Sequence, residues 1–440
     1  MKIRNLLILG LLACPLAASA QEPAGPWTLS QCIAWAQEHN ITVQQSSISA
    51  EQSEIELNTA RNSRLPGVSS SASQSYSFGR GLSMDNTYVN TNTSSTSFNL
   101  GASMDIFNGF RTNETIKLDQ LNLKAATADL EKARNDLSLN VAQAYVQILY
   151  DMEIRDVASR QVAIDSFQVA RLEDMVRTGK ASGADLAQQQ ATLAQSQYSL
   201  TQAENNLSLA LLTLSQLLEL PSPEGFSIVA PEVDPEVFRI EDPESVYSSA
   251  LVTRPEILAE QYRLSGYDSQ IKIAKSSLYP SLSLNGGLGT NYYTTSGYDH
   301  ASFGDQITNN FSQYLGLSLN IPIFSKFSIR NDIRTAELRR RSQELQLENT
   351  KKNLYKEIQQ AYYNAVAALA KYRSSQEAAE SAEKSFELVT SKYENGKASI
   401  TEFNEARNNA LKSASDLVQS RYEFLYQTKV LSFYKGEKLG

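Results

Sequence analysis

The sequence predicts an α+β membrane protein whose duplicated chain contributes four β-strands and several very long helices. Two stretches without Gly or Pro are each about 70 residues long, far longer than an ordinary globular helix. Two pairs of segments alternate between apolar and small polar residues, which is the pattern of half-buried strands. The order of these parts occurs twice along 440 residues, and a hydrophobic content of 41% is sufficient for a large core.

The amino terminus, residues 1–20, is predicted to be a secretory signal peptide. Two basic residues precede an apolar stretch, and an Ala-Ser-Ala cleavage signal ends at Ala20. An alternative interpretation is a lipoprotein signal in which Cys14 accepts the lipid, although Pro15 fits that signal poorly. Cleavage after Ala20 would leave Cys32 as the single cysteine of the mature chain, so no internal disulfide is expected.

Charge and hydropathy narrow the possible partners. The formal net charge of -8 makes the chain a poor candidate for binding nucleic acid. After the signal, no apolar run approaches the roughly 20 residues that a membrane-spanning helix requires. Any crossing of a membrane is therefore expected to use strands.

The two halves of the chain align as structural repeats, predicted to be 21–230 and 231–440. The tetrapeptide GKAS begins at Gly179 and again at Gly396, 217 residues later. Near the start of each half the offset is 214. The three additional residues lie between 280 and 324, where a loop is expected.

Each repeat is expected to begin with one helix, at 29–64 and at 243–278, which a following proline ends. Two alternating segments follow in each repeat, within about 67–107 in the first and about 281–324 in the second. Strands of about 10 residues can cross an outer membrane when tilted, with the apolar face toward lipid and the polar face toward a lumen. A soluble sandwich with one wet face is the alternative that the strands alone leave open.

The polar stretches 79–95 and 293–310 separate the strands of each pair and are expected to be exterior loops. Four strands cannot close a barrel, because about eight are needed to enclose an interior. An open sheet edge in lipid would be prohibitive. Other copies of the chain are therefore expected to close the barrel, and a cyclic trimer would supply twelve strands.

The two stretches without Gly or Pro, 110–178 and 323–395, are expected to be helices on the order of 100 Å long. A helix returns after each GKAS, so each tetrapeptide is expected at the tip of a helical hairpin. Apolar residues recur every seven positions in both return helices, which predicts left-handed coiled coils. These positions are Leu186, Leu193, Leu200, Leu207 and Leu214, and Phe403, Ala410, Leu417, Phe424 and Leu431.

A return helix of about 37 residues covers only half of its long partner, so the leading helix of each repeat is expected to cover the other half. The segment 221–242 is expected to form a belt at the midpoint, together with both chain termini. The strands would then occupy one end of the molecule and the GKAS tips the other.

The order and lengths of these parts resemble the TolC family of outer-membrane channel tunnels, over essentially the whole mature chain. The resemblance implies a homotrimer with a twelve-stranded barrel in the outer membrane and a helical tunnel through the periplasm. It also implies a function as the exit duct of a tripartite efflux pump or a type I secretion system. The implied partners are a periplasmic adaptor and an inner-membrane transporter of RND, ABC or MFS type.

The resemblance further implies a gate at the hairpin tips, at Asp185, Tyr393, Glu402 and Glu405. It assigns adaptor docking to both tetrapeptides: Gly179, Lys180, Ala181, Ser182, Gly396, Lys397, Ala398 and Ser399. A gate arginine of the family is replaced here by Ala398, and the neighbouring Lys397 or Lys180 could substitute for it.

The gate acids also allow an alternative interpretation. Rings of carboxylates from Glu402 and Glu405 would favour cations in a pore. However, Ser399 to Glu402 and Ser182 to Asp185 both match the capping box that starts a helix. Because Glu405 lies outside the cap, it is the better test of a gate role.

The residues that enzymes require are sparse. His39 and His300 have no partners at metal-ligand spacing, and there is no phosphate-binding glycine loop, HExxH or GxSxG motif. No catalytic residue, metal or cofactor is therefore expected, and transport is expected to be passive. The main alternative function is a periplasmic coiled-coil adaptor or structural protein, which also has long hairpins but lacks the alternating strands.

Overall fold

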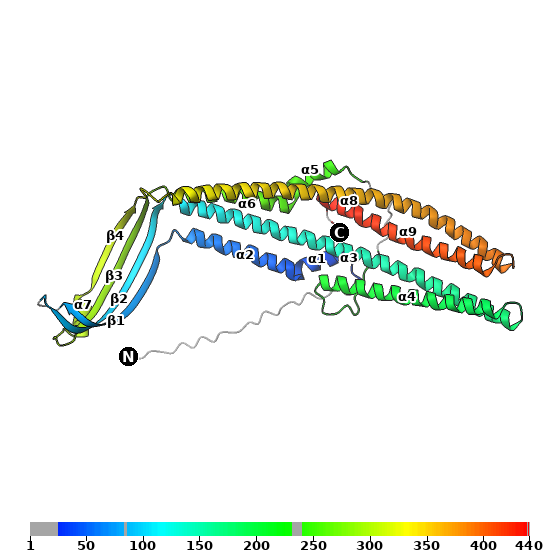
Figure 1. Cartoon of the computed structure of the whole chain (residues 1–440), viewed down its shortest axis with the longest axis horizontal. Helices are drawn as coiled ribbons and strands as arrows, with labels where there is room; N and C mark the ends of the chain where they lie inside the picture. The colour runs from blue at the N-terminus through cyan, green and yellow to red at the C-terminus, as the bar shows by residue number, and fades with distance from the viewer. Residues whose placement is uncertain (1–24, 83–85, 231–239, 438, 440) are drawn as a thin grey trace, which may run out of the picture.

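The computed structural model describes residues 25–82, 86–230, 240–437 and 439, so the predicted signal peptide with Cys14 lies outside the described residues. The molecule is elongated, with the strands at one end and the tips of two helical hairpins at the other (Figure 1). The described chain starts and ends near the middle of its length. Among the described helices, none has the length and apolar character needed to cross a membrane.

The two repeats contain matching helices, 214 positions apart for the leading helices and 217 positions apart for the long and return helices. The first holds α1 (Leu29–His39), α2 (Ile41–Asn62), β1 (Gly67–Leu82), β2 (Tyr88–Asn108), α3 (Arg111–Arg177) and α4 (Gly183–Leu217). The second holds α5 (Pro243–Thr253), α6 (Pro255–Ser276), β3 (Ser281–Thr295), α7 (Phe303–Asn309), β4 (Ser312–Asn320), α8 (Ser328–Glu394) and α9 (Ile400–Lys435). Both long helices have 67 residues and begin 217 positions apart.

The prediction of one continuous leading helix is wrong in the first repeat, because the chain breaks at Asn40. Asn40 is extended, and its side chain accepts a hydrogen bond from the Thr42 amide, so it starts α2. The Asn40 side chain also donates from Nδ2 to the Leu217 carbonyl at 3.2 Å, at the end of α4. Trp35 donates from Nε1 to the Leu218 carbonyl at 3.0 Å. The break therefore ties α1 and α2 to the unsatisfied last turn of α4.

The leading helix of the second repeat is also broken, at Arg254. Pro255 is the first residue of α6, and a proline forces the preceding residue out of the helical region. Arg254 is accordingly extended with ψ 126°. Its guanidinium is buried, pairs with Glu256 at 3.1 Å, and lies over the rings of Phe433 and Tyr434.

The strands form one antiparallel sheet in the order β1-β2-β3-β4. They are 16, 21, 15 and 9 residues long, so the predicted uniform length of about 10 is wrong. Most of the predicted loop 79–95 belongs to β1 and β2, where Phe78 pairs with Asn92 and Gly81 with Val89. In the second repeat α7 occupies part of the predicted loop 293–310 and packs on β3 through Thr290, whose hydroxyl donates to the Ile307 carbonyl. Within the chain, β1 and β4 are the sheet edges.

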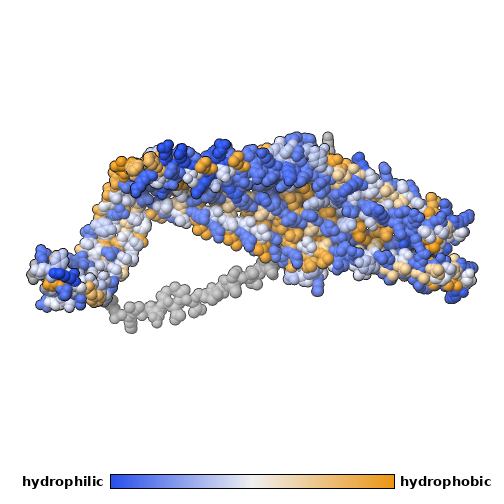
Figure 2. All heavy atoms as spheres, in the orientation of Figure 1, coloured by the Kyte–Doolittle hydropathy of each residue, from blue (hydrophilic) through white to orange (hydrophobic). Residues whose placement is uncertain are grey.

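Exposed aromatic and aliphatic side chains gather where the strands pass into the long helices, the hydrophobic corner in Figure 2. Phe107 and Phe110 stack edge to face at 5.3 Å, and the equivalent Phe324 and Phe327 do so at 5.7 Å. Aromatic residues at this level are typical of the interface between a membrane and water. The corner therefore lies where the predicted membrane-crossing sheet is expected to meet water.

The coiled-coil heptads differ between the two return helices. In α9 the predicted positions Phe403, Ala410, Phe424 and Leu431 are buried, because α9 packs against both α8 and α3. In α4 the predicted leucines are only half-buried before Leu214. The most buried stripe of α4 lies three positions later, at Gln189, Ser196, Ala203 and Ala210. The difference arises because α4 packs mainly along α3, whereas α9 packs against two long helices.

The middle of the molecule holds the main core. Val141, Ile148 and Leu214 are fully buried there, with Trp27 and Ile228 forming a short parallel bridge beside them. Lys435, near the carboxyl end, pairs with Glu241 at 2.6 Å. The described parts of the expected belt, 221–230 and 240–242, thus contact Trp27 and Lys435, near the two ends of the described chain, and the rest of the belt lies outside the described residues.

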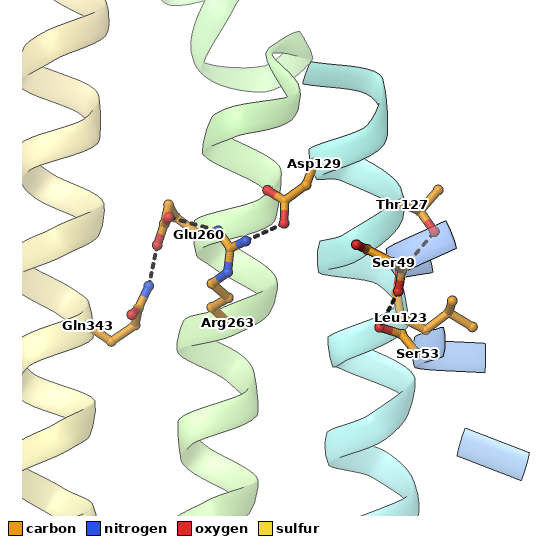
Figure 3. A network of polar contacts seen from close by, with 8 residues as sticks. All are labelled: Ser49, Ser53, Leu123, Thr127, Asp129, Glu260, Arg263 and Gln343. Carbon is orange, nitrogen blue, oxygen red and sulfur yellow. Dashed lines mark hydrogen bonds and ion pairs between the residues drawn. The ribbon is translucent and has the colours of Figure 1, made fainter. Parts of the chain in front are cut away.

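The helix α6 connects the two repeats. Arg263 on α6 binds Asp129 on α3, and Glu260 on α6 accepts from Gln343 on α8 (Figure 3). Arg263 and Glu260 also pair with each other at 2.8 Å. One continuous set of polar contacts therefore crosses three helices.

Candidate functional site: the hairpin tips

Each tip is closed by the glycine of its GKAS tetrapeptide. Gly179 has φ 73° and Gly396 has φ 70°, the left-handed conformation that glycine adopts without strain. The next amide in each case reaches back to the last helical turn, from Lys180 to the Met175 carbonyl and from Lys397 to the Lys392 carbonyl, both at 2.8 Å. This is the Schellman arrangement that ends a helix.

The serine of each tetrapeptide starts the returning helix through a capping box. The Asp185 amide donates to Ser182 Oγ at 3.1 Å, and the Glu402 amide donates to Ser399 Oγ at 3.2 Å. In return, the Ser399 amide donates to Glu402 Oε2 at 2.7 Å, which lowers the pKa of this carboxyl below its usual value. Capping of α4 and α9 by Asp185 and Glu402 is therefore confirmed.

Tyr393 brings the two tips together. Its ring stacks on Phe403 at 5.0 Å, and the Arg171 guanidinium lies 5.7 Å above it. Burial raises the pKa of the Tyr393 phenol, the positive charge of Arg171 opposes this, and the negative charge of Asp185 raises the pKa further. The carboxylate of the first tip thus acts on the phenol of the second.

Arg171 is a functional candidate that sequence reasoning missed. It lies on α3 in the first hairpin, and its guanidinium pairs with Glu394 of the second hairpin at 3.6 Å. In the described part of the chain, the side chains of Lys180 and Lys397 make neither ion pairs nor hydrogen bonds. Arg171 is therefore the cation that joins the tips within this chain.

A buried polar cluster lies further from the tips, around Asp165 on α3. Asp165 is fully buried and binds Arg407 of α9, which is 5% exposed. Gln161 Nε2 donates to the same carboxylate at 3.0 Å, Gln189 Nε2 at 3.3 Å, and Ser196 through its hydroxyl. One carboxylate therefore holds three helices from both hairpins, α3, α4 and α9.

A third ion pair ties the hairpins closer to the middle of the molecule. Arg421 on α9 binds Glu153 on α3, and the Tyr422 hydroxyl donates to the same carboxylate at 2.7 Å. Burial and the hydrogen bond to Glu153 raise the pKa of Tyr422 to about 12. Three ion pairs thus follow one seam, at Arg171, Asp165 and Glu153 of α3.

These ion pairs have no equivalents in the other repeat. At the 217-residue offset, Arg407 corresponds to Gln190 and Asp165 to Ala382. Arg421 and Glu153 correspond to Glu204 and Ala370. The ties are therefore specific to the contact between the two hairpins of one chain.

The remaining predicted residues are spread over the tip surface. Glu405 is exposed on α9, one turn beyond the cap, and has no ion pair among the described residues. Ala398 makes no polar side-chain contact, as its methyl group requires. The structure brings Asp185 close enough to Tyr393 for its charge to act on the phenol, while Glu402 and Glu405 lie at the start of α9.

Comparison with protein families gives one match that spans both repeats. The family described as outer membrane efflux protein matches residues 33–219 and 246–436. The outer membrane efflux protein BepC of Brucella suis is 20% identical over 405 residues, covering 92% of this chain and 84% of that protein. The outer membrane protein TolC of Escherichia coli is 22% identical over 377 residues, covering 84% and 74%.

Solved structures show the same fold. A crystal structure of CusC has a TM-score of 0.78 at 18% identity, covering 95% of this chain and 96% of that chain. The outer membrane protein VceC of Vibrio cholerae has a TM-score of 0.75 at 18% identity, covering 94% and 97%. At these identities the likeness establishes the arrangement of strands and helices.

Proposed function

Because the chain belongs to the outer membrane efflux protein family, we propose that it is the passive exit duct of a tripartite efflux pump or a type I secretion system. The chain is an outer-membrane protein that extends into the periplasm, and it has the barrel-and-tunnel fold of the TolC-like channels. The predicted resemblance to the TolC family is confirmed by the family match.

One structural observation supports this function most strongly. The sheet and the hairpin tips lie at opposite ends of two 67-residue helices, which at 1.5 Å per residue span about 100 Å. A single chain therefore reaches from the outer membrane deep into the periplasm. A periplasmic adaptor and an inner-membrane transporter of RND, ABC or MFS type are the partners proposed at the far end.

The duct is proposed to be a homotrimer. The two unpaired sheet edges, β1 and β4, support this assignment, because open edges are not tolerated in lipid and other copies of the chain would pair with them. Three copies would contribute twelve strands, enough to enclose a water-filled lumen.

The tips are proposed to form the gate and to carry the adaptor docking site. The loops that join α3 to α4 and α8 to α9 lie at the end of the molecule opposite the sheet (Figure 1), and Gly179, Gly396 and the residues after them are exposed or half-buried. The ion pairs of Arg171, Asp165 and Glu153 hold the hairpins of one chain together. An adaptor that engages the tips would have to change these contacts to widen the pore.

The purified full-length protein is expected to conduct ions across a planar lipid bilayer without any energy source. Replacing both gate acids, as Glu402→Gln/Glu405→Gln, is expected to shift the reversal potential in a salt gradient toward lower cation preference, because two rings of carboxylates would be lost. The matched control is Glu380→Gln/Glu387→Gln on α8, which removes the same charge from exposed positions away from the tips.

The two halves of this experiment test different statements. Absence of conductance from the wild-type protein in repeated reconstitutions would contradict the duct. Conductance with identical reversal potentials for the gate variant and its control would remove Glu402 and Glu405 from the pore.

A further inference from the structure

Two exposed apolar stripes run along α2 and α8. Ile48 and Ile55 on α2 are 53% and 65% exposed, and Leu338 and Leu345 on α8 are 69% and 64% exposed. The members of each pair are seven residues apart and therefore share one helix face. Neither stripe is covered by the described chain.

Both stripes lie opposite the contacts that their helices make within the chain. Leu57, which packs with Ile116 of α3, is two positions from Ile55. Gln343, which reaches α6, is two positions from Leu345. Two residues along an α-helix correspond to about 200° around its axis. A helix packed on either stripe would therefore lie on the side opposite the neighbour within the chain, α3 for α2 and α6 for α8, as in a closed ring of helices.

The second repeat supplies a template for that missing neighbour. Its helix α6 packs against both α3 and α8, whereas the equivalent α2 packs along α3. Arg263 of α6 contacts Asp129 of α3. At the repeat offsets of 214 and 217, the equivalent positions are Ser49 on α2 and Gln346 on α8. Antiparallel helices in that register bring Ile48 to within two positions of Leu345 and Ile55 to within two positions of Leu338.

We propose that α2 of one copy packs in this register against α8 of a second copy and that Glu51 and Arg341 pair between the two apolar contacts. Glu51 lies between Ile48 and Ile55, and Arg341 lies between Leu338 and Leu345. Within the described chain, both charged side chains are exposed and have no ion pair or side-chain hydrogen bond. Apolar contacts on both sides and opposite charges between them fit a second copy of this chain.

The proposed seam between the two copies continues toward the tips, between α4 of one copy and α8 of the other. At the offset of 217, the positions equivalent to Arg407 and Asp165, which pair within the chain, are Gln190 on α4 and Ala382 on α8 of the second copy. In that register Leu209 of α4 lies beside Tyr363 of α8, and both are more than half exposed in the single chain. The seam between copies is therefore apolar where the seam within the chain is ionic.

This inference rests on the proposed multimeric duct and is tested by crosslinking in native membranes. The variant Ile48→Cys/Leu345→Cys, treated with a short bismaleimide, is expected to give a ladder of covalent dimers and closed trimers in denaturing gels. The matched control Ile48→Cys/Leu388→Cys uses another exposed leucine of α8, 43 positions further along, and is expected to give no ladder.

Charge exchange gives a second, independent readout. Glu51→Arg and Arg341→Glu are each expected to lower the temperature at which the detergent-solubilised oligomer dissociates, because like charges would face each other. The double variant is expected to restore most of that loss. Failure of the double variant to improve on either single one would overturn the Glu51–Arg341 pair.

Failure of the proposed contact between copies can be distinguished from failure of the proposed function. A trimer that conducts but gives no ladder from Ile48→Cys/Leu345→Cys would overturn the seam and leave the duct intact. A wild-type protein that neither conducts nor forms an oligomer would overturn the proposed function itself.

Discussion

Arg407→Ala is expected to lower the free energy of unfolding by about 3–5 kcal/mol and to increase the conductance of the closed duct. The substitution leaves the fully buried carboxylate of Asp165 without its cation, and an uncompensated buried charge is strongly destabilising. It also removes the tie between α9 and α3, so the two hairpins are free to separate. Thermal unfolding and single-channel recording measure the two effects.

The control for this prediction removes both charges. In Asp165→Asn/Arg407→Met the asparagine Oδ1 can keep the hydrogen bond from one of Gln161 and Gln189, and its Nδ2 can donate to the other once that glutamine amide turns over. The methionine fills the space of the arginine stem. This variant is expected to be more stable than Arg407→Ala, while its conductance remains raised. Arg407→Ala protein with wild-type stability and conductance would show that the ion pair neither supports the fold nor closes the gate.

Gly109→Ala is expected to disrupt the passage from β2 into α3 and to reduce strongly the amount of heat-sensitive oligomer in the membrane. Gly109 has φ 65°, which costs a residue with a side chain about 1–2 kcal/mol. An added Cβ would also lie 2.5 Å from the Ser276 carbonyl oxygen and 3.0 Å from Tyr279 Cβ. These neighbours include backbone, so the strand or α6 would have to shift.

The repeat offers a matched control at Lys326, the equivalent position of the second half. Lys326 has φ 51° and already carries a Cβ. Lys326→Ala is therefore expected to change the free energy of unfolding by less than about 0.5 kcal/mol. Gels of unheated and heated samples compare the two variants, and equal oligomer yields from both would contradict the steric account.

The long elements of the fold could be predicted because their signals are local. Helices α3 and α8 occupy the stretches without Gly or Pro, and both tips follow from a glycine in the left-handed conformation and a serine cap. Pro255 was a local signal for the break before α6 that the sequence interpretation overlooked. No proline stands at the equivalent Ile41, and the break there depends on hydrogen bonds to the end of α4.

The strand lengths could not be read from alternation alone. Segment 79–95 is rich in Asn, Thr and Ser, which indicates a loop in isolation. In the fold these residues pair with neighbouring strands, as Tyr76 does with Ser94 and Thr93 with Thr295. Pairing with neighbouring strands therefore extends the sheet into polar residues that lack the alternation of apolar and polar side chains.

The candidate site was only partly predictable. The caps at Asp185 and Glu402 are contacts over three residues and could be read directly. Arg171, Asp165 and Arg407 are single charged residues on polar helices, where a solvated position is the ordinary expectation. Their contacts join residues more than 200 positions apart, so they depend on how the two hairpins pack.

Fractionation of cells tests the central claim most directly. The mature protein is expected in the outer membrane, to require detergent for extraction, and to run as a trimer in unheated gels and as a single chain after heating. Release of the protein with the soluble periplasmic contents would contradict the exit duct and favour the coiled-coil adaptor or structural protein.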